Sequence, residues 1–206
     1  MSSIKLTADS NGGTFELKAP ASSSNTRVLT LPDTANGTVL TTTNPRSGSV
    51  VQVVQAVKTD VSSWSFETSN ANFKETGLQA TITPTKASNI ILVWASGMYG
   101  GTVAEENTYW TISRSSDGNY FQVGDTASNR TRVTTGSYIN STSRPETFSC
   151  FAIDTNHNTT SANTYKLLSN GNNSSGTGYL NRTGDNSDGF FRPRGTSTLI
   201  LQEIEV

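Results

Sequence analysis

The sequence has little charge, a single cysteine, a single histidine and no long hydrophobic run. Its 206 residues include 15 Lys and Arg and 16 Asp and Glu. One cysteine excludes an internal disulfide, so stability has to come from packing or assembly. The longest apolar run, 90–95, is too short to cross a bilayer, and no membrane insertion is expected. The basic residues are scattered, which argues against nucleic-acid binding because phosphates require clustered Lys and Arg.

In place of charge, the chain is rich in Ser, Thr, Asn and Gly. These residues favour turns and solvated strand faces, and they disfavour helix interiors because their side chains compete for backbone hydrogen bonds. A net charge of −1 differs from the high-charge signature of disordered chains. No period of 3.6 residues is visible along the chain. The sequence therefore predicts an all-β fold.

Residues 1–48 form a distinct first segment. Apolar and polar residues alternate over 4–8 and 15–19, with a turn at 11–13 between them, and 27–31 predicts another short strand. The segment has few large apolar side chains, and an isolated hairpin is marginal in water. Without a disulfide, several copies would have to wind together to bury what one copy cannot. We therefore predict a short intertwined β segment that makes the protein an oligomer.

Residues 49–206 predict a jelly-roll-like β-sandwich of short strands separated by Gly, Asn and Ser turns. The expected strands are 50–57, 78–83, 90–94, 110–112, 120–123, 148–153, 165–168 and 199–206. The continuous apolar run at 90–94 is typical of a central strand that is covered on both faces. Cys150 lies within a strand pattern, and we expect it to be a small buried apolar side chain.

Two polar regions, 129–145 and 170–188, are predicted to be long loops on this sandwich. Binding sites usually lie on such loops, and Tyr and Arg are enriched at recognition surfaces. The alternative is a flexible, solvated surface. If the loops do bind a receptor, the candidate residues for hydrogen bonding and stacking on a sugar or protein surface are Arg130, Arg132, Tyr138, Arg144, Tyr179 and Arg182.

No pattern in the sequence favours catalysis, a metal or a cofactor. His157 lies in a turn-like segment, 154–158, and is predicted to be an exposed loop residue. That segment is similar to the start of a calcium loop, but it lacks the glycine at the sixth position and the acid at the twelfth. Glu105 and Glu106 are adjacent, so on a strand they would point to opposite faces and could not flank one glycosidic bond.

The first segment also resembles a known module. It is similar to the trimeric segment that precedes the distal domain in tail fibres of marine and cyanobacterial tailed phages. The residues that carry this resemblance are Ser3-Ile-Lys-Leu-Thr-Ala-Asp9, Gly12-Gly13, Leu17-Lys-Ala-Pro20, Leu29-Thr-Leu-Pro32 and Gly37-Thr-Val-Leu-Thr-Thr42. A looser similarity to terminal domains of that group extends to 51–55 and 195–201.

The resemblance implies a homotrimer and a non-enzymatic virion protein on the particle surface. We expect a trimeric tail-fibre or spike component that is assembled in the host cytoplasm. Its N-terminal segment would contact other virion proteins, and its C-terminal domain would contact a glycan or protein on the host surface. Fibres of that group usually carry a long shaft and an attachment domain, whereas here the module begins at Met1. A head-fibre or capsid decoration protein, or a lectin-like carbohydrate-binding module, is therefore the alternative.

Overall fold

The protein is an all-β molecule, as predicted. The computed structural model describes residues 3–7, 12–18, 21–22, 24, 45–68, 72–118, 120–172 and 175–206. These residues form twelve strands and no helix, so no helix among them is long and apolar enough to cross a membrane. The chain divides into two compact units, Met1–Val39 and Leu40–Val206. The strand predicted at 27–31 lies outside the described residues.

The first unit contains an antiparallel hairpin of β1 (Ser3–Thr7) and β2 (Thr14–Lys18), in which Ile4 lies opposite Leu17. The strand regions predicted from alternation are therefore present. The side chains of Ile4 and Leu17 are 65% and 48% exposed, and that of Leu6 is 58% exposed. The hairpin does not bury these three side chains, which is the condition from which we predicted assembly.

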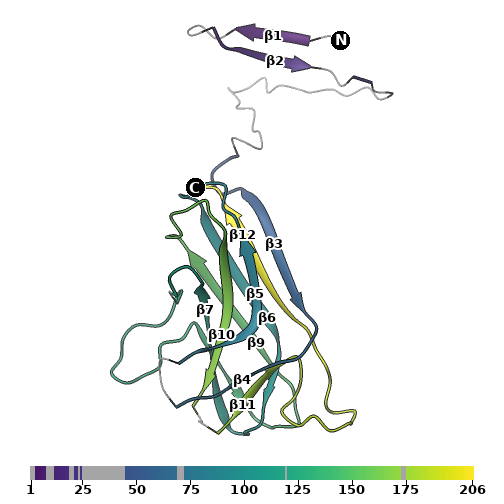
Figure 1. The fold of residues 1–206 in the computed structure, drawn as a ribbon, viewed down its shortest axis with the longest axis vertical. Helices are drawn as coiled ribbons and strands as arrows, with labels where there is room; N and C mark the ends of the chain where they lie inside the picture. Colours follow the sequence, from purple (N-terminus) through teal and green to yellow (C-terminus); the bar gives the residue numbers. More distant parts are fainter. Residues whose placement is uncertain are drawn as a thin grey trace, which may run out of the picture. The chain divides into compact units, whose positions relative to one another are not determined.

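The second unit consists of two antiparallel sheets that pack as a sandwich (Figure 1). The larger sheet has the order β3-β12-β6-β11-β4, and β9 pairs with β6. Its strands are β3 (Val50–Lys58), β12 (Ser197–Ile204), β6 (Ile90–Gly101), β11 (Thr177–Leu180), β4 (Ser62–Ser65) and β9 (Glu146–Asp154). The smaller sheet has the order β5-β10-β7-β8, formed by β5 (Lys74–Ile82), β10 (Asn163–Gly171), β7 (Glu106–Arg114) and β8 (Thr135–Ile139).

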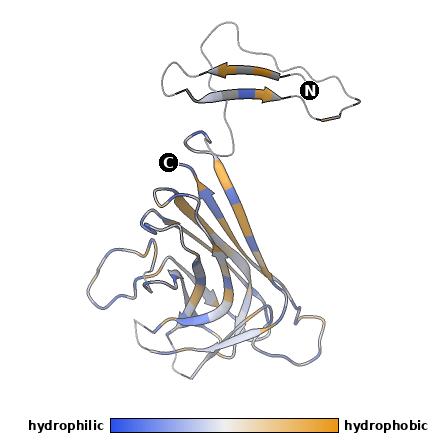
Figure 2. Ribbon diagram, turned by 45° about the horizontal axis from the view of Figure 1, so that its top comes forward, coloured by the Kyte–Doolittle hydropathy of each residue, from blue (hydrophilic) through white to orange (hydrophobic). Residues whose placement is uncertain are grey.

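The core lies between the two sheets and is built from alternate residues of each strand. On β5 the pattern is regular, with Leu78, Ala80 and Ile82 buried between exposed polar neighbours. Trp110 is stacked on Phe148 from the opposite sheet with a centroid distance of 4.4 Å. The strands carry most of the hydrophobic residues, whereas the connecting loops are largely hydrophilic (Figure 2). The predicted sandwich is therefore confirmed.

One strand prediction was wrong, and two predicted loops contain strands. The region 120–123 forms no strand, and only Tyr120 makes an isolated bridge, to Ser113. Conversely, the two regions predicted as long loops contain β8 and β11, which are short and carry glycine and hydroxyl side chains. Neither strand has a clear apolar alternation, so the sequence does not reveal them. The position of β8 is set by pairing with β7, and that of β11 by pairing with β4 and β6.

The strand β6 is central, because it pairs with β12 on one side and β9 on the other. In its first half, Ile91, Val93 and Ala95 are buried and face the core. Trp94 points to the other side and is 56% exposed. The prediction that 90–94 is covered on both faces is thus wrong for the single chain, in which only one face of the sheet is covered.

Candidate binding site

A hollow of about 300 Å³ lies where β4 and β11 meet the loop that follows β11. It is lined by Val61, Ser62, Ser63, Tyr179, Arg182, Asn186 and Arg194. We call this the arginine hollow. Its lining offers two guanidinium groups, a phenol ring, two hydroxyls and an amide, and it includes no acidic side chain. This balance of charge favours an anionic ligand.

The two predicted residues that line the hollow are in direct contact. The guanidinium carbon of Arg182 lies 3.5 Å from the centroid of the Tyr179 ring. Such stacking restricts the long arginine side chain and keeps its planar fork in one orientation. The Nε of Arg182 is buried and forms no hydrogen bond with the protein. An arginine held in this way loses little conformational entropy when it binds a ligand.

The second guanidinium enters the hollow from the far end of the same loop. A backbone bridge joins Arg182 to Arg194, and Arg194 Nη2 donates a hydrogen bond of 2.7 Å to Asn186 Oδ1. Neither arginine forms an ion pair with any of the residues that the structure describes. Two like charges on adjacent chain segments repel each other, and a bound anion would relieve this repulsion.

Asn181 fixes the start of the loop that carries both arginines. It is fully buried and has a φ of 63°, a left-handed conformation that Asn adopts more readily than most residues. Its side-chain amide donates hydrogen bonds of 2.8 Å to the carbonyl oxygens of Lys58 and Asp60. Its Oδ1 accepts one of 2.7 Å from Ser197 Oγ. These bonds set the direction in which the next residue, Arg182, leaves the sheet.

Asp185 lies in the middle of the loop, and its carboxylate is already paired with a third arginine, Arg192. Its carboxylate accepts hydrogen bonds from Arg192 Nε at 2.7 Å and from the backbone and hydroxyl of Ser187 at 2.9 and 2.7 Å. The hydrogen bonds from Ser187 and the nearby Arg192 hold the pKa of Asp185 well below its ordinary value. A Cβ at Gly184 would lie 1.8 Å from the Gly101 carbonyl, so the loop packs directly on β6.

The other four predicted residues lie outside the lining of the arginine hollow. Arg130 and Arg132 are exposed in the long connection between β7 and β8, where Arg132 Nε donates to the Gly124 carbonyl at 2.6 Å. Tyr138 lies on β8 and is 46% exposed. Arg144 lines a different hollow together with Ser143, Pro145, Phe191 and Arg192. The six candidates therefore do not form one site.

Sequence reasoning missed most of the remaining lining, above all Ser62, Ser63, Asn186 and Arg194. Arg194 stands two residues from Arg192, and this pair is among the densest basic clusters in the sequence. The close spacing of these two arginines was the only signal in the sequence that pointed to Arg194. The two serines lie on β4, whose polar sequence carries no strand pattern of its own.

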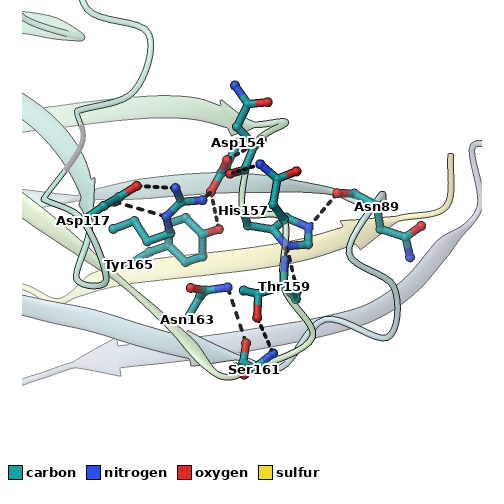
Figure 3. Close-up of polar contacts among 11 residues, drawn as sticks. Asn89, Asp117, Asp154, His157, Thr159, Ser161, Asn163 and Tyr165 are labelled. Carbon is teal, nitrogen blue, oxygen red and sulfur yellow. Dashed lines mark hydrogen bonds and ion pairs between the residues drawn. The ribbon is translucent and has the colours of Figure 1, made fainter.

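A second polar cluster lies inside the sandwich (Figure 3). His157 is only 6% exposed, so the prediction that it is an exposed loop residue was wrong. Its Nδ1 lies 3.0 Å from the Thr159 carbonyl oxygen and its Nε2 2.6 Å from that of Asn89. The ring can donate from Nε2 to the Asn89 carbonyl oxygen, while Nδ1 can accept from the backbone N–H of Thr159 at 3.5 Å. These contacts tie the segment after β9 to the turn before β6.

Asp154 is the acidic member of this cluster and is 1% exposed. Its carboxylate accepts hydrogen bonds of 2.7 Å from Arg114 Nη1 and from the Tyr165 hydroxyl, and one of 2.8 Å from the Asn156 backbone (Figure 3). Burial and the bond to Asp154 raise the pKa of Tyr165. The carboxylate that would begin a calcium loop is thus engaged in protein contacts. No group of three His, Cys, Asp or Glu side chains that could hold a metal occurs among the described residues.

Cys150 behaves as predicted. It lies on β9, is 1% exposed and packs within the core cluster. Burial raises the pKa of its thiol to about 12, so the reactive thiolate is scarce at neutral pH.

Comparisons with known proteins give only distant structural similarities. No family model matches the chain, and no curated protein does so. Among solved structures, the chain is similar to the T=1 particles derived from infectious bursal virus, with 14% identity, a TM-score of 0.40, and coverage of 98% of this chain and 44% of that one. It is also similar to the VP2 subviral particle of infectious bursal disease virus, with 13% identity, a TM-score of 0.40, and coverage of 94% and 47%. The chain spans less than half of the length of these structures.

Proposed function

We propose that this protein is a non-enzymatic virion structural protein whose sandwich binds an acidic glycan on the host surface through the arginine hollow. One observation carries the binding proposal. Arg182 and Arg194 line the same hollow without a carboxylate partner, and Arg182 is stacked on Tyr179.

The lining suits an acidic sugar better than a neutral one. Guanidinium groups bind carboxylates and sulfates with paired hydrogen bonds, and such charge-assisted bonds are about twice as strong as neutral ones. The hydroxyl of Ser63 and the amide of Asn186 can both donate to and accept from sugar hydroxyls, whereas the Ser62 hydroxyl donates to the Thr76 carbonyl oxygen and can only accept. A hollow with a few convergent polar groups on a rigid sheet is typical of a small-ligand site.

Binding without catalysis is the activity that we assign to this hollow. Its lining residues include no carboxylate, histidine or cysteine that could serve as an acid, base or strong nucleophile. The nearest acid in the loop, Asp185, is held ionised by Ser187 and Arg192. A ligand would therefore be held and released unchanged.

The place on the virion rests on the first unit. Its resemblance to tail-fibre segments, together with the exposed Ile4, Leu6 and Leu17, supports a trimeric tail fibre or spike that contacts other virion proteins through 1–48. A head-fibre or capsid decoration protein has the same support. A separate observation favours a lectin-like module. Every residue of the arginine hollow belongs to the second unit, so the proposed glycan site does not need the first segment.

Calorimetry on the full chain tests the binding proposal. The probe is a galacturonate tetrasaccharide, and its methyl-esterified form provides the same sugar without charge. We expect binding of the acidic form, competition by sulfate, and a loss of at least tenfold in affinity with Arg182→Gln plus Arg194→Gln. The matched control is Arg130→Gln plus Arg132→Gln, which should leave affinity unchanged. Equal binding of both sugars, or an equal loss in the two double variants, would reject the arginine hollow as the site.

The virion placement has its own test. Gold-labelled antibodies against the protein should decorate the tails of intact particles. Label on heads alone would favour the decoration protein, and particles without label would favour the lectin-like module.

A further inference from the structure

The larger sheet has a second face that points away from the core, and we call it the outer face. It is formed by alternate residues of four neighbouring strands, β3, β12, β6 and β9 (Figure 1). Its residues are Val53, Gln55, Val57, Thr198, Ile200, Gln202, Leu92, Trp94, Ser96, Ser149, Phe151 and Ile153. None of these twelve side chains is charged, whereas a solvated sheet face usually alternates polar and charged groups with the buried ones.

The centre of the outer face is aromatic and aliphatic. Trp94 lies opposite Ile200 on β12 and Phe151 on β9. The rings of Trp94 and Phe151 meet edge to face with a centroid distance of 6.2 Å. They remain 56% and 43% exposed, and Val53 and Val57 on β3 are 55% and 57% exposed.

Hydroxyl side chains border this centre along the neighbouring row of the sheet. Thr198 lies opposite Ser96, and Ser96 lies opposite Ser149. Together with Trp94 and Ile200, these residues line a groove. The outer face therefore presents an apolar band beside a band of small neutral polar groups.

Such a face is expected to be covered. Its central strand has the continuous apolar sequence that is typical of strands buried on both sides, yet the single chain covers only one side. The four most exposed apolar side chains, Trp94, Phe151, Val53 and Val57, contribute roughly 400 Å² per copy, which is the size of the largest and often functional patch on a typical monomer. Together with its other residues, the outer face has an area of the same order as the ~800 Å² that each partner contributes to a standard interface.

We propose that the outer face is the interface between copies of this chain, with the outer faces of neighbouring copies packed against one another. Two uncharged faces can pack against each other without electrostatic repulsion. A charged partner surface would instead lose the hydration of its charges on contact with the outer face, which is unfavourable. The proposal rests on the homotrimer of the proposed function and assigns the contact surface to the sandwich, in addition to the first segment. Three such faces turned toward a common axis would bury Trp94 and Phe151.

Sedimentation of the full chain gives the first test. We expect the natural protein to sediment as a trimer at micromolar concentration and Trp94→Thr plus Phe151→Thr to shift it toward monomer by at least tenfold in dissociation constant. Thr suits an exposed strand position. The matched control is Phe190→Ser plus Phe191→Ser, which removes two exposed rings, 95% and 73% exposed, from a loop. A natural protein that sediments as a monomer, or an equal shift in both variants, overturns the proposal.

A thiol probe gives a test that does not disturb the apolar residues. Because Cys150 is buried, a thiol introduced by Ser149→Cys is the one that reacts with a small maleimide. We expect its labelling to slow at least tenfold as the protein is concentrated into the multimer. A thiol introduced by Gln79→Cys, on the exposed side of β5, should label at a constant rate. Equal rates in the multimer would place the interface elsewhere and overturn the assignment.

The two proposals fail separately. The outer face and the arginine hollow share no residue. Galacturonate binding should therefore persist in Trp94→Thr plus Phe151→Thr. An interface variant that still forms trimers would reject the interface proposal but not the glycan proposal. A protein that does not bind the acidic sugar would reject the glycan proposal but not the interface proposal.

Discussion

The side-chain amide of Asn181 donates a 2.8 Å hydrogen bond to the carbonyl oxygen of Lys58, 123 residues earlier in the chain. The bond connects the end of β3 to the first residue after β11. Because Asn181 directly precedes Arg182, this contact and its companions determine where the first guanidinium of the arginine hollow is held. Asn181 is therefore a positioning residue for the proposed site.

We predict that Asn181→Ala lowers both stability and ligand affinity. The substitution removes three buried hydrogen bonds and places Ala at a φ of 63°, and we expect a loss of about 3 kcal/mol in the free energy of unfolding. Asn181→Gly loses the same bonds but tolerates the backbone, so it should cost about 1 kcal/mol less. Urea unfolding measures both values, and equal losses would show that the left-handed backbone is not strained.

We predict that Arg182→Lys weakens binding of the galacturonate probe although it keeps the positive charge. An ammonium group cannot reproduce the planar stack on Tyr179 or the paired hydrogen bonds of a guanidinium. A loss of about tenfold is expected, and Tyr179→Leu should cause a similar loss by freeing the arginine. Calorimetry on the two single variants and on their combination tests the coupling. Losses that simply multiply would mean that the two residues act independently.

Much of the fold could be predicted from the sequence where the local pattern and the final packing agree. Leu78, Ala80 and Ile82 alternate with polar residues, and they alternate in burial on β5. The apolar neighbours of Cys150 indicated a buried strand in the same way. In such elements one residue in two faces the core, so the sequence carries the periodicity of the sheet.

The rest could not be predicted because it is specified by distant partners. The strands β4 and β11 have few apolar residues, and they are specified by pairing, β4 with β11 and β11 also with β6. The burial of His157 depends on a carbonyl 68 residues away, at Asn89, which no local pattern reveals. The arginine hollow likewise combines residues 61–63 with residues 179–194, so only two of its members were found among the tyrosines and arginines of the polar regions.

We predict that Asp154→Asn destabilises the protein strongly. Asp154 is buried and accepts from Arg114, so its neutralisation leaves the arginine without its most buried partner. A loss of about 3 kcal/mol in the free energy of unfolding is expected. The matched control is Asp117→Asn, which removes the charge of the other, more exposed carboxylate beside the same arginine and should cost less. Denaturant unfolding at neutral pH compares the two, and equal costs would contradict the role given to burial.

We predict that Cys150 does not react with a thiol reagent in the folded protein at pH 8. Its side chain is 1% exposed, and burial raises the pKa of the thiol to about 12, so both access and thiolate are lacking. In urea the thiol should react fully. The variant Gln79→Cys should show one fast and one silent thiol. Rapid reaction of two thiols in the folded variant would show that β9 opens readily.

We predict that Glu203 makes the fold sensitive to acid. Its side chain is fully buried and accepts hydrogen bonds from Gln52 Nε2 at 2.5 Å, from Asn89 Nδ2 at 2.7 Å, and from the backbone and hydroxyl of Thr85 at 2.7 and 2.8 Å. Burial acts to raise its pKa, but the hydrogen bonds outweigh this effect, and the pKa of Glu203 lies below the ordinary value of 4.5.

A carboxyl group with a lowered pKa in the folded state stabilises the fold fully above the pKa of the unfolded chain. This contribution is lost as the pH falls from about 4.5 through the lower pKa of the folded state. Glu203→Gln should therefore cost about 1 to 3 kcal/mol at pH 7, because an amide cannot accept all of these bonds. The difference from the natural protein should shrink below pH 4.5. Thermal unfolding between pH 3 and 7 measures it, with Glu75→Gln as an exposed control; a difference that is constant with pH would mean that Glu203 is not the acid-sensitive group.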